Sequence, residues 1–188
     1  CWGDYDETVL DVPILSTPTQ ISTYDDHSCA LDAEGVKCWG HNGNGETDVP
    51  ALSNPIFVST GSWYTCAIDD NGGHCWGYNA YGQTDVPSLS NPIMVSGQNY
   101  HTCALDDNGV QCWGDNGDGQ TNVPNLSNPV MVSAGTWHTC ALDDNGIQCW
   151  GYNAYGQTDV PNLSNPIMVS VGGNLTCAID DNGVQCWG

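Results

Sequence analysis

The sequence predicts an all-β protein of tandem 37-residue blades, each with three to four antiparallel strands and one disulfide, forming a β-propeller or an open β-superhelix. Three observations predict this class. A Cys-Trp-Gly triplet recurs at equal intervals. Short runs of alternating apolar and polar residues lie between Gly, Pro, Asn and Asp. Each interval also holds a second cysteine at a constant distance from the next triplet.

The repeat sets the domain organisation. Its triplets begin at Cys1, Cys38, Cys75, Cys112, Cys149 and Cys186, always 37 residues apart. A unit this small cannot bury its apolar face alone, so neighbouring units must stack on a shared core. We therefore expect residues 1–188 to form a single array of five units and the start of a sixth. Because the sequence has neither a start Met nor a signal peptide, we also expect it to be a segment of a longer chain.

A second period covers two units. The units from Cys75 and Cys149 share the text Gly-Tyr-Asn-Ala-Tyr-Gly-Gln, whereas Trp63 and Trp137 recur at matching positions of the other pair. Odd and even units thus alternate, as expected of a duplicated two-unit block.

The unit around Cys103 shows the expected strands, at residues 93–96, 102–105 and 110–113. The Asp-Asp-Asn-Gly text between the last two suits a four-residue loop built on a type I turn, with Gly in the left-handed position. This register places Leu105 opposite Val110 and Cys103 opposite Cys112. Cross-strand neighbours have Cβ atoms about 4.5–5.5 Å apart, which nearly suits a disulfide.

The same register predicts one disulfide in each unit: Cys29–Cys38, Cys66–Cys75, Cys103–Cys112, Cys140–Cys149 and Cys177–Cys186. Zinc sites usually show a closer Cys-x-x-Cys spacing, so we predict no metal site at these cysteines. Cys1 is left over, either because its partner precedes it or because it bonds to another chain. The 11 cysteines indicate an oxidising compartment, outside the cell or at its surface.

One face of each hairpin carries the two cysteines, and the other carries the Trp of the triplet and an Ala. Because this other face is also partly apolar, we expect both faces of each sheet to be covered. We assign the Trp of each triplet to packing between blades.

These motifs resemble the regulator of chromosome condensation repeat, particularly its short secreted and extracellular type. The resemblance rests on residues 95–105, on the Asp-Asn-Gly turn and Val-Gln-Cys-Trp-Gly that follow, and on Asn-x-x-Gly-Gln. It covers nearly the whole chain in five units. It implies a propeller, typically of seven blades with three or four strands each, and places His27, His101 and His138 in the blade core. It does not imply nucleotide exchange or chromatin binding.

Five units do not make seven blades, and three interpretations stay open. The chain belongs to a longer array that closes a ring, it forms part of an open superhelix or filament, or Cys1 bridges to another chain.

Charge excludes two classes of partner. With 22 acidic residues, one basic residue and a net charge of −21, the chain cannot neutralise nucleic-acid phosphates or bind an anionic membrane surface. No apolar run is long enough for a membrane span, so we expect no membrane insertion. Asp and Asn in the turns cap local backbone donors, or alternatively bind Ca²⁺ weakly and diffusely. We predict no other cofactor.

Eight aromatic residues are candidates for ligand binding because they vary between units and cluster in predicted loops. They are Trp63, Tyr64, Tyr78, Tyr81, Tyr100, Trp137, Tyr152 and Tyr155. They either contact a ligand or merely cover loop backbone. Three sequons make Asn125, Asn162 and Asn174 candidates for N-glycosylation.

No pair of nucleophile and base stands out, and histidines that recur in several units do not define one catalytic site. The sequence therefore predicts a non-catalytic extracellular protein with a structural or adhesive role, as a building block of a cell-surface or filamentous assembly. Its partner would be another copy of itself or another extracellular protein. The alternative is a secreted propeller that binds a protein or glycan through its aromatic loops.

Overall fold

A computed structural model describes residues 11–188 of the chain. Cys1, whose pairing the sequence left open, lies outside the described residues. The described part contains β-strands and turns and no helix, so it holds no helical segment able to cross a bilayer. The all-β class is confirmed.

The strands form five antiparallel sheets of three, each with its strands in sequence order. The strand bounds are β1 Gln20–Tyr24, β2 His27–Asp32, β3 Gly35–Gly40, β4 Phe57–Gly61, β5 Tyr64–Asp69, β6 Gly72–Gly77, β7 Met94–Gly97, β8 His101–Asp106, β9 Gly109–Gly114, β10 Met131–Ala134, β11 His138–Asp143, β12 Gly146–Gly151, β13 Met168–Val171, β14 Thr176–Asp180 and β15 Gly183–Trp187. Each blade therefore has three strands, the lower of the two numbers expected.

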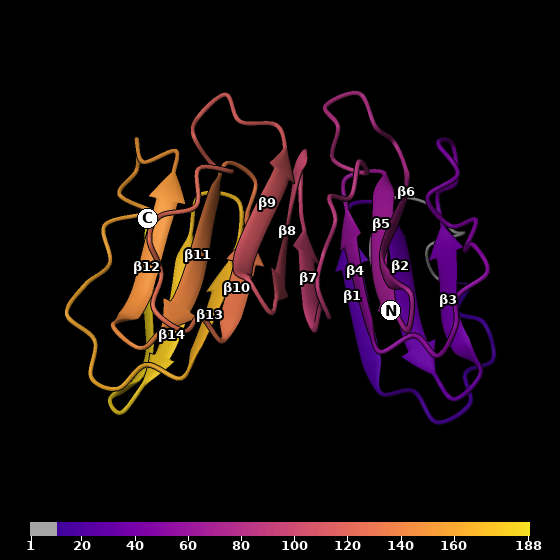
Figure 1. Ribbon diagram of the computed structural model, residues 1–188, viewed down its shortest axis with the longest axis horizontal. Coiled ribbons are helices and arrows are strands. Elements are labelled where there is room, and N and C mark those ends of the chain that lie inside the picture. Colours follow the sequence, from indigo (N-terminus) through magenta and orange to yellow (C-terminus); the bar gives the residue numbers. More distant parts are fainter. Residues whose placement is uncertain (1–10) are drawn as a thin grey trace.

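The sheets follow one another along the molecule in chain order (Figure 1). The first strands of neighbouring sheets lie against each other: β1 contacts β4, β4 contacts β7, β7 contacts β10 and β10 contacts β13. Consecutive sheets thus pack face to face around a line of inner strands, as the blades of a propeller do.

The predicted hairpin register is confirmed. Leu105 pairs with Val110 and Cys103 with Cys112. The strands reach further than expected, because Asp106 also pairs with Gly109 and leaves a two-residue turn instead of a four-residue loop. Gly109 has a φ of 103°, and a carboxylate oxygen of Asp106 accepts a 2.8 Å hydrogen bond from the backbone N of Asn108. Both features allow the chain to turn this tightly.

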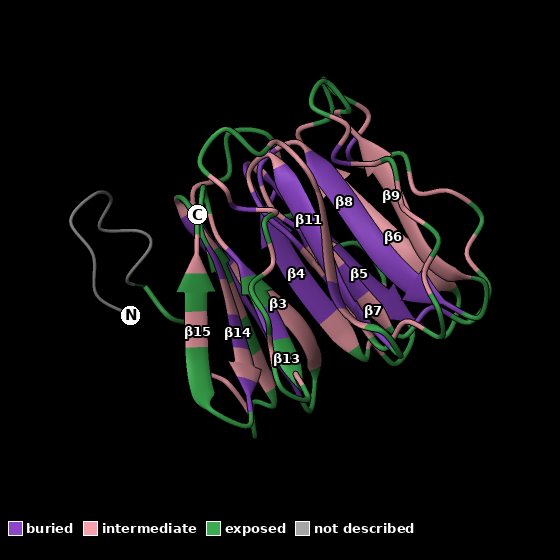
Figure 2. Cartoon of the chain, turned by 90° about the vertical axis from the view of Figure 1, so that its left-hand side faces the viewer, coloured by how far each residue is buried: buried purple, intermediate pink, exposed green. Residues whose placement is uncertain are grey.

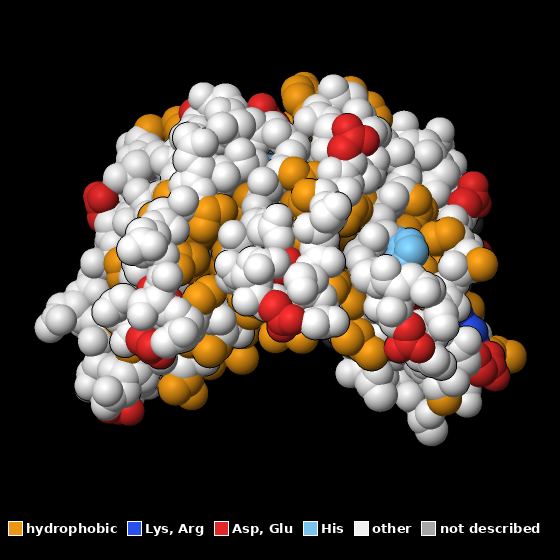
Figure 3. Space-filling view, viewed as in Figure 1, with side chains coloured by type: hydrophobic (Ala, Val, Ile, Leu, Met, Phe, Trp, Pro, Cys, Tyr) orange, Lys and Arg blue, Asp and Glu red, His pale blue; other side chains and the backbone are white. Residues whose placement is uncertain are grey.

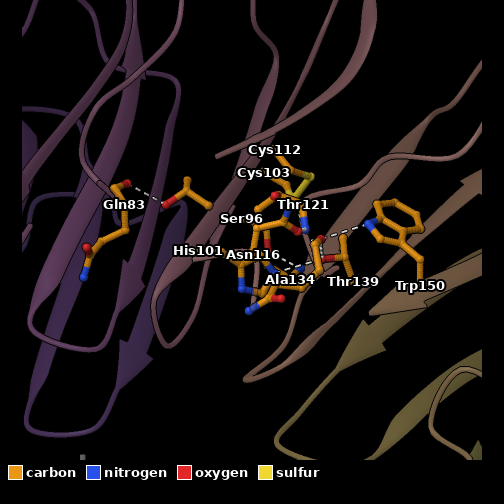
Figure 4. Close-up of a disulfide and its surroundings, with 12 residues drawn as sticks. Gln83, Ser96, His101, Cys103, Cys112, Asn116, Thr121, Ala134, Thr139 and Trp150 are labelled. Carbon is orange, nitrogen blue, oxygen red and sulfur yellow. Dashed lines mark hydrogen bonds between the residues drawn. A yellow bond between two sulfur atoms is a disulfide. The ribbon is translucent and has the colours of Figure 1, made fainter. Parts of the chain in front are cut away.

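All five predicted disulfides are present, one in each sheet. In the third sheet the bond between Cys103 and Cys112 lies beside Ser96, His101 and Thr139, where the third and fourth sheets meet (Figure 4). Each bond joins β-strands two and three of its blade and so holds a small module together.

Both faces of the inner sheets are covered, as the sequence predicted. Every residue of the middle strands β2, β5, β8 and β11 is buried (Figure 2). The fifth sheet differs on its outer side, where Met168, Leu175 and Val184 are 45%, 48% and 68% exposed. Within the described residues, no sixth sheet covers them.

Candidate ligand-binding site

The three histidines predicted to be structural connect neighbouring blades. Their Nε2 atoms lie 2.7–2.9 Å from a threonine Oγ1 of the next blade, in the pairs His27–Thr65, His101–Thr139 and His138–Thr176. Each threonine hydroxyl donates its own hydrogen to a backbone carbonyl, so the histidine Nε2 must be the donor of this bond. The histidines therefore act as Nε2–H donors inside an interface.

Burial explains the weak basicity of these histidines. It lowers the pKa of His101 to about 3, with a further contribution from His138, and lowers the pKa of His138 to about 4. Each ring bonds to a threonine hydroxyl that already donates to a backbone carbonyl, and both rings serve the contact between blades.

Tyr64 is a correction to the predicted aromatic candidates. Its side chain is fully buried and occupies the position that histidine takes in other blades. The hydroxyl donates a 2.7 Å hydrogen bond to the carbonyl of His101, across the next blade interface. Gly61 and Gly97 provide the space, because a Cβ at either position would meet the Tyr64 side chain at 2.1 and 2.6 Å. Sequence reasoning missed this because the neighbouring glycines, and not the tyrosine itself, signal its burial.

The tryptophans of the triplets join blades in the same way, as predicted. In four cases the indole Nε1 donates a hydrogen bond of 2.8–3.1 Å to a backbone carbonyl of the preceding repeat: Trp76 to Glu46, Trp113 to Gln83, Trp150 to Gln120 and Trp187 to Gln157.

The acidic turns serve local structure. Hydrogen bonds from the backbone of Ser16, then of Glu34, and from the Lys37 side chain lower the pKa of Asp32 to about 2. In each of the four later turns, the first Asp accepts the same kind of hydrogen bond from the backbone N of a serine: Ser53, Ser90, Ser127 or Ser164. Across residues 11–188 no three His, Cys, Asp or Glu side chains are arranged to hold a metal ion. The turn-capping interpretation accounts for the first Asp of each turn, and weak calcium binding by the turns stays a prediction.

Seven of the eight aromatic candidates lie together at the opposite end of the sheets from these turns. We call this surface the aromatic face; it comprises Trp63, Tyr78, Tyr81, Tyr100, Trp137, Tyr152 and Tyr155. Its residues come from the loops between the first two strands of a blade and from the loops that follow the third strand. Antiparallel pairing brings these two kinds of loop to one end of each sheet, and the repeat places them side by side.

The rings of the aromatic face form a nearly continuous row. Tyr81 stacks on Tyr100 with centroids 4.4 Å apart, and Tyr78 lies 6.4 Å from both rings. Trp63 meets Tyr78 edge-on at 5.7 Å, and Trp137 meets Tyr100 edge-on at 6.3 Å. Such spacings are those of interacting aromatic pairs, so the rings support one another on the surface.

The backbone at Trp63 adds a local strain. Its φ of 60° lies in the left-handed region, which costs a large residue energy and persists only where the surroundings enforce it. Its carbonyl accepts a 2.8 Å hydrogen bond from the backbone N of Tyr78, which fixes the two loops to each other.

A cavity of about 310 Å³ continues the aromatic face into the fourth and fifth repeats. It is lined by Asp118, Trp137, Tyr152, Tyr155 and Asn174. Tyr152 and Tyr155 lie with ring centroids 6.1 Å apart. Asp118 was not among the ligand-binding candidates predicted from the sequence, and Asn174 was predicted only as a glycosylation candidate. The two-unit period was the available signal, since it aligns Asp118 with Asn44 and Asn174 with Tyr100.

The three sequon asparagines are all exposed. Asn125 lines a separate cavity beside the acidic turn of the third blade, and Asn174 lies on the aromatic face. Their glycosylation stays a prediction.

Comparison with known proteins agrees with this architecture. Residues 19–46, 95–120 and 131–157 match the family model of the regulator of chromosome condensation (RCC1) repeat. A search of curated proteins finds no match.

Similar solved structures include extracellular parts of plant receptor kinases. One is the entire ectodomain of Physcomitrella patens CR4, with 22% identity and a TM-score of 0.77, covering 93% of this chain and 55% of that one. Another is the CRINKLY WD40 ectodomain of Arabidopsis thaliana ACR4, with 22% identity and a TM-score of 0.73, covering 91% and 65%.

A third is the complex of Kap60 with yeast RCC1 (Prp20), with 16% identity and a TM-score of 0.75, covering 90% and 55%. Identities this low show a shared fold, and this chain spans between 55% and 65% of the length of these three structures.

Proposed function

Because the chain carries regulator of chromosome condensation repeats on a propeller-type fold, we propose that it is a non-catalytic, extracellular binding module. Its aromatic face would recognise another protein. The observation that carries the proposal is the gathering of seven aromatic side chains, drawn from loops of successive repeats, on one end of a disulfide-bonded scaffold. Rigid scaffolds commonly place recognition residues on such loops.

Exposure and rigidity both suit binding. Tyr81 and Tyr155 are 47% and 63% exposed, so their rings have much surface still to bury. Tyrosine and tryptophan lose little conformational entropy on binding and are enriched among residues that dominate protein interfaces. Ectodomains and RCC1 in a protein complex are among the similar structures, which supports protein binding at the level of the fold.

Five disulfides support a location outside the cell, because such bonds persist in oxidising compartments. The buried histidines support a non-catalytic role, since each is engaged in holding two blades together.

The test compares binding of the purified chain to a panel of extracellular proteins before and after removal of surface rings. Tyr81→Ala combined with Tyr155→Ala should weaken capture of a genuine partner by roughly tenfold or more. Ile93→Ser is the matched control, because Ile93 is 60% exposed at the opposite end of its sheet. Equal binding by all three proteins would contradict the proposal. A glycan is the alternative ligand for the same rings, and a glycan array with the same variants tests it.

A structural or adhesive role is a second proposal, favoured by the uncovered outer side of the fifth sheet. Met168, Leu175 and Val184 expose apolar surface there. In the preceding blade the counterparts of the first and last, Met131 and Ile147, pack against Val169 and Val171 of the next blade. A sheet of the same kind would cover it, either from a further repeat of a longer chain or from another copy of this one. Sedimentation at rising concentration should show association that Val184→Asp abolishes, and a monomer at every concentration would contradict this role.

A further inference from the structure

We propose that the cavity between Trp137, Tyr152 and Tyr155 binds a positively charged side chain, arginine or lysine, of a protein partner. The inference rests on the proposed function, because it names the chemistry by which part of the aromatic face would recognise that partner.

The walls of the cavity are held in place before any ligand arrives. The backbone N of Tyr152 donates a 2.9 Å hydrogen bond to the carbonyl of Trp137. The backbone N of Tyr155 donates a 3.0 Å bond to the side chain of Gln157, which is fully buried. Asp118 is held similarly, through a 2.9 Å bond from its backbone N to the buried side chain of Gln120. Buried glutamines thus position the cavity loops, and a preorganised site loses little entropy on binding.

The equivalent place two repeats earlier is filled by the protein itself. There Tyr100 occupies the position of Asn174 and stacks on Tyr81, the counterpart of Tyr155, at 4.4 Å. At the later position the shorter Asn174 leaves the space beside Tyr155 open. The loop after the third strand is identical at the two places, in residues 78–84 and 152–158, whereas residues 97–101 and 171–175 differ throughout. The exchange of Tyr100 for Asn174 within that second loop leaves the cavity unfilled.

Charge and ring chemistry favour a cation in this space. The faces of Trp and Tyr rings carry negative electrostatic potential and attract ammonium and guanidinium groups. The Asp118 carboxylate lines the same cavity, and within the described residues it accepts no hydrogen bond. Asn44 stands at the equivalent earlier position, so the negative charge is also specific to this cavity.

The rest of the chain is also strongly acidic, which favours a positively charged ligand. The net charge is −21, and the basic Lys37 is already paired with Asp32 and Glu34 at the acidic-turn end of the first sheet. Acidic side chains are spread over the visible surface, while basic surface appears at one end (Figure 3). A volume of about 310 Å³ admits the end of one side chain. Arginine suits it especially, because its flat guanidinium stacks on aromatic rings and pairs with a carboxylate.

The probe is a short acetylated Gly-Arg-Gly amide, compared with the same peptide carrying citrulline, which is nearly isosteric with arginine but neutral. Binding is followed by NMR through the indole N–H signal of Trp137, with the chain produced unglycosylated and with its disulfides formed. The arginine peptide should bind about fivefold or more tightly than the citrulline peptide, and the difference should shrink as salt is raised. Equal binding of the two peptides would overturn the inference, as would a neutral sugar that binds where arginine does not.

Three variants localise the effect. Asn174→Tyr should close the cavity as Tyr100 does in the earlier repeat, and should abolish binding of the peptide. Asp118→Asn should weaken binding of the arginine peptide by about threefold to tenfold and leave the citrulline peptide unaffected. Asn125→Tyr is the matched control, because it makes the same change at an exposed asparagine outside the aromatic face. Unchanged binding by Asn174→Tyr, in a protein that melts like the wild type, would overturn the inference.

The two proposals fail separately. If the arginine peptide does not bind but Tyr81→Ala still weakens capture of a partner, only the cation inference fails. If removal of the surface rings leaves partner capture intact, the binding function fails whatever the peptide does.

Discussion

Replacing His101 with glutamine is expected to remove part of the acid sensitivity of folding. The Nε2–H of His101 donates to Thr139 at 2.8 Å, and its buried Nδ1 has no hydrogen-bond partner among the described residues. Protonation at low pH would place a charge and a new N–H on that unpartnered, buried nitrogen. Glutamine keeps an amide donor for Thr139 and does not titrate.

The expected loss of stability follows from the difference in the pKa of His101 between the folded and the unfolded state. In the unfolded chain the pKa of histidine is about 6.5, whereas burial lowers that of His101 to about 3. The unfolded state therefore binds more protons below about pH 6.5, so the free energy of unfolding falls as pH falls. Between pH 7 and about pH 4.5 this one group should remove about 2.5 kcal/mol.

The assay is urea unfolding of both proteins at the two pH values. Carboxylates that titrate in acid are common to both, so their contribution cancels in the comparison. The wild type should lose about 2.5 kcal/mol more than the variant on acidification, whatever the variant loses at neutral pH. An equal loss in both proteins would refute the assignment of His101 as a buried neutral donor, and an NMR titration of the histidine would locate the error.

Three further predictions concern the blade interfaces and hairpins. Gly61→Ala should destabilise the protein by several kcal/mol or prevent folding, because the added Cβ would lie 2.1 Å from the Tyr64 ring. Gly117→Ala is the control, because a Cβ there would lie 3.6 Å from its nearest neighbour. Similar melting curves for the two variants would contradict the burial of Tyr64 against Gly61. Trp150→Phe should cost about 0.5–1.5 kcal/mol in thermal unfolding, because the carbonyl of Gln120 loses one of its two donors and keeps the Thr139 hydroxyl. An unchanged melting temperature would argue against the indole bond. Replacing both cysteines of one interior disulfide by alanine should cost about 2.7 kcal/mol in urea, since the bond closes a loop of about 10 residues; a loss under 1 kcal/mol would show that the turn alone holds the hairpin.

The local structure was largely predictable from sequence. A strict repeat, a Gly-containing turn and two cysteines nine positions apart define a hairpin whose partners are close along the chain. The register of Cys103 against Cys112 and of Leu105 against Val110 follows from that local information, as do the disulfides. The error in turn length was small, because the side chain of Asp106 caps a tighter turn than the loop we expected.

The binding surface was predictable only in part. The variable aromatic residues were identified by their residue type and their place in loops, but Tyr64 belongs to the blade interface and Asp118 to the cavity. Residue type alone does not show which side chains pack between blades and which line the cavity. The glycines that admit Tyr64 become informative only when Gly97 of the next repeat is known to meet its ring. The exchange of Tyr100 for Asn174 becomes informative only when the loops that line the cavity are known to lie together.

The sequence by itself determined the class of fold, the unit length, the hairpin register and the pairing of the cysteines, because each depends on residues within one repeat. Only the tertiary structure decided that Tyr64 faces a neighbouring blade, whereas the other seven aromatic candidates lie together at one end of the sheets. Those outcomes depend on how successive sheets pack, since hydrogen bonds such as that from His101 to Thr139 join residues of different repeats. The aromatic face and the cavity beside Trp137 arise at that level.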